Sequence, residues 1–132
     1  MDLTEETQRI LIEWSRQQAP NEACGILSYD TLRRMRNVSP TPETAFICAG
    51  LGDVVLHNQA GYLNDHLERY AIWHSHPTSR AVPTRPDIDL MRETLAPMII
   101  VSLASTVPEV AIFALDEHNA ERVICVRSYR PS

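Results

Sequence analysis

The sequence contains no lysine. Its 12 basic residues are all arginines and stand against 17 acidic residues, for a formal net charge of -5 over 132 residues. Because nucleic-acid binding relies on clustered positive charge, this balance argues against a nucleic-acid surface. The tightest basic cluster is Arg33, Arg34 and Arg36, which we interpret as a solvated turn. We therefore predict no nucleic-acid partner.

Cysteine is scarce as well. Cys24, Cys48 and Cys125 are odd in number and widely spaced, and no C-x-x-C pair occurs among them. The sequence therefore supports neither a disulfide framework nor a zinc knuckle. All three have apolar neighbours, a setting typical of free cysteine acting as a small buried hydrophobic residue. We expect all three in the core.

Long apolar runs are also missing. The longest, Met98 to Ala104, is far shorter than the roughly 20 residues that span a bilayer. The opening residues, Met-Asp-Leu-Thr-Glu-Glu, lack the basic and apolar regions of a secretion signal. We expect a cytoplasmic protein without membrane association. The 44% hydrophobic and 22% charged content excludes a disordered chain, and the length fits a single domain over residues 1–132.

The local patterns predict a mixed α+β domain with helices packed on a sheet. Helices are expected over residues 4–18, 59–69 and 84–95, and strands over 23–29, 32–38, 44–49, 53–56, 70–74, 98–103, 110–115 and 122–129. Helical spacing over 84–95 directs Ile88, Met91, Leu95 and Leu90 toward the core, and Pro97 ends that helix. Polar residues alternate with apolar ones in the last strand, which suits a sheet edge.

The residues that carry chemistry begin at Trp73-His74-Ser75-His76-Pro77. Two histidines at positions i and i+2 of a strand project to the same face, with backbones about 6.6 Å apart. Both imidazoles can therefore reach one metal ion at bond lengths of about 2 Å. Asp87, eleven residues after His76 and at the start of a helix, is the candidate third ligand. Two histidines and one carboxylate leave a fourth zinc position open for water.

A hydrolytic site also needs a base that does not bind the metal. Glu22 directly precedes an apolar strand and suits that role if this strand lies beside the histidine strand.

Other residues near the motif have simpler interpretations. Asp89 could replace Asp87 as a ligand, although the spacing favours Asp87. His57, His66 and His118 lack partners at metal spacing, so we interpret them as surface or packing residues. Ser75 fills the position between the two histidines and is given no chemical role.

Together these residues resemble the JAMM (JAB/MPN+) metallopeptidase signature, E…H-x-H-x7-S-x2-D, in its bacterial form. The match comprises Glu22 with Gly25, His74-x-His76-Pro77, Thr84 and Asp87. The resemblance implies a cytidine-deaminase-like JAB/MPN domain with a central, mostly antiparallel sheet flanked by helices. It implies Zn2+ bound by His74, His76 and Asp87, with Glu22 as general base.

The sequence departs from the signature at two places. Thr84 stands where the family has a serine that stabilises the tetrahedral intermediate; it keeps the hydroxyl but restricts χ1. Thr84 and Asp87 also form a T-x-x-D pattern that can cap a helix, which is compatible with metal binding by Asp87. Residues 53–70 are shorter than the insertion that relatives often carry there.

The resemblance implies a zinc-dependent peptidase or isopeptidase that hydrolyses an amide bond, deubiquitinase-like, at the C-terminal Gly-Gly tail of a ubiquitin-like or sulfur-carrier protein. Such tails bind extended beside a sheet edge. Three alternatives remain open: a phage-tail or cell-wall-type peptidase domain, a non-catalytic MPN scaffold, and a thiol hydrolase that uses Cys24 with a nearby histidine. A RadC-like role in DNA metabolism is disfavoured, because that group has the histidine motif without the Glu-x-x-Gly start and because the chain is acidic.

Overall fold

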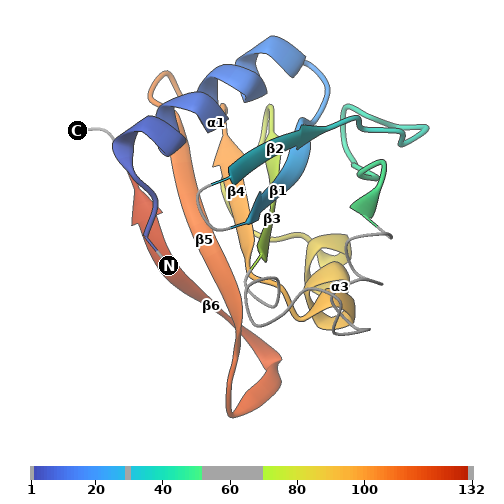
Figure 1. Cartoon of the computed structure of the whole chain (residues 1–132), viewed down its shortest axis with the longest axis vertical. Coiled ribbons are helices and arrows are strands. Elements are labelled where there is room, and N and C mark those ends of the chain that lie inside the picture. Colours follow the sequence, from blue (N-terminus) through green and yellow to red (C-terminus); the bar gives the residue numbers. More distant parts are fainter. Residues whose placement is uncertain (1, 29–30, 52–69, 131–132) are drawn as a thin grey trace.

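The computed structural model describes residues 2–28, 31–51 and 70–130. The described part contains these elements: α1 (Glu5–Gln18), β1 (Cys24–Ser28), β2 (Thr31–Met35), β3 (Tyr70–His76), α3 (Arg85–Thr94), β4 (Met98–Ser102), β5 (Glu109–Asp116) and β6 (Asn119–Tyr129). Figure 1 shows their arrangement. The expected helix over 59–69 and strand over 53–56 lie outside the described residues, together with His57 and His66. Within these ranges, none of the helices has the length and apolar character to cross a membrane.

The six strands form one sheet in the order β2-β1-β3-β4-β5-β6. Neighbours pair antiparallel except β3 and β4, which pair in parallel and are joined through α3. The mixed α+β fold with a mostly antiparallel sheet is therefore confirmed. The last strand lies at an edge of this sheet, as its alternating pattern indicates.

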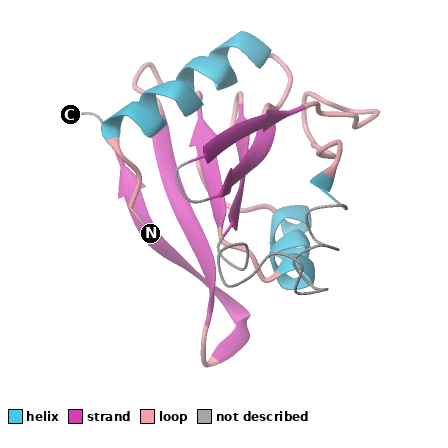
Figure 2. Ribbon diagram, in the orientation of Figure 1, coloured by secondary structure: helices cyan, strands magenta, loops and turns pink. Residues whose placement is uncertain are grey.

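The two helices cover opposite faces of the sheet (Figure 2). Under α1, one apolar cluster joins Leu11 of the helix to Trp73, Ile99 and Ile112 of the sheet. On the other face, Met91 of α3 packs with Met98 and Ile100. Because side chains alternate along a strand, β3 directs Trp73 to the α1 face and His74 to the α3 face. The histidine pair therefore lies on the same side of the sheet as α3.

Gly25 of β1 lies between Trp73 of β3 and the backbone of Arg33 on β2. The indole Nε1–H of buried Trp73 donates to the carbonyl oxygen of Arg33 at 3.0 Å. A Cβ at position 25 would overlap this oxygen and lie 2.5 Å from the indole nitrogen. Only glycine leaves room for this hydrogen bond, which links β3 to β2 across β1.

Two expected elements differ in the structure. Residues 44–49 do not form a strand: their single ladder contact is an isolated bridge between Asn37 and Cys48. The Asn37 side chain makes hydrogen bonds to the backbone of this segment in place of a ladder.

Arg33 and Arg34 do not lie in a turn. They lie on β2, and Arg34 donates to the side chains of Gln17 and Gln18.

Two burial predictions are wrong. Leu95 is 78% exposed because α3 ends one residue earlier and Leu95 takes a left-handed conformation at φ 59° as its C-cap. The buried face of α3 instead runs through Asp87, Met91 and Thr94. Cys125 is exposed because it lies on the edge strand β6, whereas Cys24 and Cys48 are buried as expected.

Candidate metal centre

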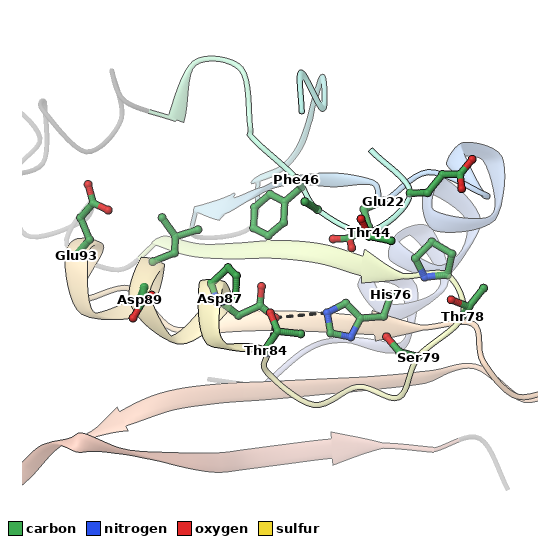
Figure 3. A pocket seen from close by; sticks show the side chains of 15 residues that line it. Glu22, Thr44, Phe46, His76, Thr78, Ser79, Thr84, Asp87, Asp89 and Glu93 are labelled. Atoms are coloured by element: carbon green, nitrogen blue, oxygen red, sulfur yellow. Dashed lines mark hydrogen bonds and ion pairs between the residues drawn. The ribbon is translucent and has the colours of Figure 1, made fainter. Parts of the chain in front are cut away.

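The end of β3 and the first turn of α3 bring three polar side chains together. The two imidazole Nε2 atoms of His74 and His76 lie 3.0 Å apart. Asp87 reaches both rings, with Oδ1 at 3.2 Å from His74 Nε2 and Oδ2 at 3.4 Å from His76 Nε2. Figure 3 shows the Asp87 carboxylate of α3 facing the His76 ring across this contact. All three side chains are buried.

A contact at Nδ1, on the side of the ring away from His74, sets the tautomer of His76. Nδ1 lies 2.8 Å from the carbonyl oxygen of Arg80, which can only accept, so Nδ1 carries the proton. In the neutral ring, Nε2 then presents a lone pair to His74 and Asp87. His74 Nδ1 is buried and has no hydrogen-bond partner among the described residues.

Lone pairs of two imidazoles and a carboxylate that meet at these distances require a positive charge between them. Although burial lowers it, the bond to Asp87 and the Arg80 carbonyl hold the pKa of His76 above its ordinary value, so without a metal a proton can also supply this charge. Complete burial lowers the pKa of His74, against the raising effect of Asp87, which keeps that ring neutral and able to bind a metal.

The spacing also suits a tetrahedral ion. Four ligands about 2.05 Å from zinc stand about 3.3 Å apart along the edges of the tetrahedron. The 3.0 Å between the two histidine nitrogens is close to that value, and Asp87 presents a different carboxylate oxygen to each ring, at 3.2 and 3.4 Å. The residue types and the close approach of the two rings are therefore compatible with a zinc ion.

Asp87 occupies the N3 position of α3, with Thr84 as N-cap. The backbone N–H of Thr84 donates to Asp87 Oδ2 at 2.9 Å. Burial disfavours the charged carboxylate, but the close contacts with the His74 and His76 rings and the hydrogen bond from this N–H outweigh that cost and hold the pKa of Asp87 far below its ordinary value. Asp87 thus caps the helix and faces the histidines with the same ionised carboxylate.

Glu22 approaches the histidines from the neighbouring strand. Cys24 pairs with His74 in the β1–β3 register, so the strand that follows Glu22 lies beside the histidine strand, as the base assignment requires. A carboxylate oxygen of Glu22 and one ring nitrogen of each histidine all lie within 4.8 Å of one another, a group that could also hold a metal ion. Burial raises the pKa of Glu22 to about 7, partly offset by His76.

The Ser75 hydroxyl holds the chain just after Glu22. The backbone N–H of Ala23 donates to Ser75 Oγ at 2.8 Å, and the backbone N–H of Ser75 donates to the Ala23 carbonyl at 3.0 Å. Ser75 is fully buried. The residue between the two histidines therefore ties the Glu22 segment to β3.

These side chains open into a cleft of about 570 Å³. One wall is the segment 43–46 and the other is α3 with the loop before it, where Thr84 stands (Figure 3). The carboxylates that line the cleft are those of Glu22, Glu43, Asp87, Asp89 and Glu93. Such a concentration of negative charge favours a bound cation.

Comparison with protein families matches residues 4–116 to the family described as prokaryotic homologs of the JAB domain. The chain belongs to this prokaryotic JAB family. Among solved structures, a Desulfitobacterium hafniense protein is similar at 22% identity and a TM-score of 0.63, covering 92% of this chain and 86% of the other. A Salinibacter ruber protein is 20% identical with a TM-score of 0.53, covering 99% and 92%. No curated protein matches the sequence significantly.

Within this JAB domain the structure distinguishes the alternative ligands. Asp89 pairs with Arg85 at 3.0 Å and is more than half exposed, whereas Asp87 faces the histidines. His118 is exposed, as expected for a surface residue. The sequence brought Glu22, His74, His76, Thr84 and Asp87 into one hypothesis, and all five line or adjoin the same cleft.

Sequence reasoning missed Phe46 and Arg80. The Phe46 ring stacks on His74 with centroids 4.2 Å apart and an interplanar angle of 23°. Arg80 acts through its backbone carbonyl, which any residue could supply, so the sequence carries no signal for it. Phe46 lies 28 positions before His74, and only the tertiary structure brings the two rings together.

Proposed function

We propose that this JAB domain is a zinc-dependent peptidase or isopeptidase that hydrolyses an amide bond. The observation that carries the proposal is the convergence of His74, His76 and Asp87 within 3.4 Å, beside the buried carboxylate of Glu22. A non-catalytic scaffold has no need for such a charged, buried arrangement, which is costly unless paired or bound to metal.

In this proposal His74, His76 and Asp87 hold the metal. Zinc, when bound, supplies a Lewis acid that lowers the pKa of water to about 7 and polarises the substrate carbonyl. The Arg80 carbonyl keeps the His76 proton on Nδ1 and so keeps Nε2 free as a ligand. The Thr84 N–H fixes the Asp87 carboxylate in the same way.

Glu22 acts as general base and then as general acid. Its carboxylate takes a proton from the attacking water and delivers it to the leaving nitrogen. Burial raises the pKa of this carboxyl group to about 7 in the metal-free protein, so the buried side chain is disposed to accept a proton. Thr84 lines the cleft next to Asp87, where its hydroxyl can donate to the oxygen that becomes negative as the water attacks.

The proposed substrate is a ubiquitin-like or sulfur-carrier protein with an extended Gly-Gly tail. This part of the proposal comes from the family resemblance. The cleft between the 43–46 segment and α3 is where we expect the tail to lie, because it leads to His76 and Glu22.

The test is to incubate the zinc-loaded protein with fusions that carry a Gly-Gly tail and to measure the intact masses of the products. Glu22→Gln should retain stoichiometric zinc by elemental analysis and lose turnover by roughly 10²–10⁴-fold. Glu117→Gln, which alters an exposed carboxylate outside the cleft, is the matched control and should retain turnover within about threefold.

Full turnover by Glu22→Gln would refute the mechanism. Absence of zinc from the wild-type protein would support the scaffold alternative. Loss of activity with iodoacetamide but not with a chelator would support a thiol hydrolase that uses Cys24.

A further inference from the structure

The Asn37 side chain uses its full hydrogen-bonding capacity. Its Nδ2 donates to the carbonyl oxygens of Glu22 at 2.9 Å and Ala45 at 3.0 Å. Its Oδ1 accepts from the backbone N–H groups of Ser39 at 3.0 Å and Ile47 at 3.1 Å. A terminal amide offers two donors and two acceptor sites, and here all four are used. The orientation of the amide is therefore fixed, since the flipped group would face carbonyls with oxygen and N–H groups with nitrogen.

One of these bonds acts on the proposed base. The carbonyl of Glu22 accepts from Asn37, and its backbone N–H donates to the carbonyl of Pro42 at 2.7 Å. Both backbone polar groups of Glu22 are thus bonded to the segment 37–47. From Ala23 onward the chain is instead bonded to β3. The Glu22 carboxylate therefore depends on this segment for its position.

Two other bonds act on the wall of the cleft. Ala45 and Ile47, which flank Phe46, are both bonded to the Asn37 amide. Phe46 in turn stacks on His74. The Asn37 side chain therefore links Glu22, the proposed base, to Phe46. The Phe46 ring packs on the proposed ligand His74. This network also explains why residues 44–49 hold their place without a strand ladder.

We propose that Asn37 is a positioning residue that sets the Glu22 carboxylate and the Phe46 ring relative to the histidine pair. The inference rests on the proposed function for its effect on the reaction. Asn37 acts through the backbone of other residues and is not itself a catalytic residue. The three proposed metal ligands lie on β3 and α3, so Asn37 should affect turnover without affecting metal content.

The test compares Asn37→Ala and Asn37→Asp with the wild-type protein. Asn37→Asp preserves the size of the side chain and the acceptors for Ser39 and Ile47 but loses both N–H donors. Both variants should bind zinc stoichiometrically, with kcat lowered roughly 10–100-fold and KM changed much less, as expected for a displaced catalytic group. Ser39→Ala, which removes the acceptor for Thr41 N–H within the same segment, is the matched control and should leave kcat within about threefold.

Amide hydrogen exchange gives a readout that does not depend on activity. In Asn37→Ala, the amide protons of Ser39 and Ile47 should exchange at least roughly tenfold faster, because their acceptor is gone. In Asn37→Asp, which keeps the acceptor, exchange at Ser39 and Ile47 should rise less than in Asn37→Ala while kcat still falls, which separates the link to Glu22 from general loosening of the segment.

The outcomes distinguish the two proposals. If wild type cleaves the tail, Glu22→Gln does not, and both Asn37 variants keep full kcat, the role of Asn37 is overturned and the proposed function stands. Equal losses in Ser39→Ala and Asn37→Ala would also overturn it. If the zinc-loaded wild type cleaves none of the fusions, the proposed function fails, and the proposed effect of Asn37 on turnover fails with it.

Discussion

Replacement of Gly25 by alanine tests how the three strands around the site are held. The added Cβ would overlap the carbonyl oxygen of Arg33 and lie 2.5 and 2.9 Å from indole atoms of Trp73. The carbonyl belongs to the backbone of β2, so it can yield only if that strand moves away from β1. Trp73 is fully buried and cannot swing aside.

The cost of this substitution has two parts. Overpacking in a filled interior costs about 1–3 kcal/mol. Separation of β2 also leaves the buried Trp73 N–H without its acceptor, which costs about 1–3 kcal/mol more. We therefore expect Gly25→Ala to destabilise the protein by about 4 kcal/mol, equivalent to a Tm lower by roughly 10–15 °C for a chain of this length.

Urea unfolding followed by circular dichroism measures this loss. Gly50→Ala is the matched control: a Cβ there meets none of the described residues within 4 Å, and its φ of 87° costs about 1 kcal/mol in backbone strain. Trp73→Phe in the Gly25→Ala background should recover part of the loss, since the indole nitrogen is gone. If Gly25→Ala destabilises no more than Gly50→Ala does, the close packing described for this position is refuted.

Three further predictions follow from the site. Asp87→Asn should weaken zinc binding by more than about 100-fold, because it removes a proposed ligand, and loss of a residue that only hydrogen-bonds to a ligand already costs about 10–100-fold. Titration with a zinc chelator measures the affinity. Ser75→Ala should lower the free energy of unfolding by about 1–3 kcal/mol, because Ala23 N–H is left buried without its acceptor; unchanged urea stability would contradict this. In the metal-free protein Glu22 should contribute a loss of stability as pH rises from about 4.5 to about 7, because folded Glu22 holds its proton to a pKa of about 7; Glu22→Gln should remove this contribution, at most about 3 kcal/mol, when unfolding of the two proteins is compared at pH 5 and 7.5.

The local part of the candidate site could be predicted from the sequence. Two histidines at i and i+2 must share a face because side chains alternate along a strand. Asp87, three residues after Thr84, had to fall in the first helical turn, where it caps the helix. Both conclusions depend on geometry within a few residues.

Some local patterns misled where a different interaction dominated. The apolar segment 44–49 has strand character, but the Asn37 amide satisfies its backbone groups in place of a ladder. Leu95 fits the helical period of α3, but the helix ends at Thr94 and turns Leu95 outward. The periodicity of apolar residues and the helix or strand propensity of a segment are local properties. They do not reflect hydrogen bonds from a distant side chain or the residue at which a helix ends.

By itself, the sequence determined which residues are candidates for the chemistry: the histidine pair and Asp87 as ligands, and Glu22 as base. Only the tertiary structure decided that Glu22 reaches the histidines, that Phe46 packs on His74, and that one amide at Asn37 holds both. The reason is physical. These contacts join segments that are distant along the chain, and they exist only because β1 pairs with β3 and the segment 37–47 folds back against the start of β1.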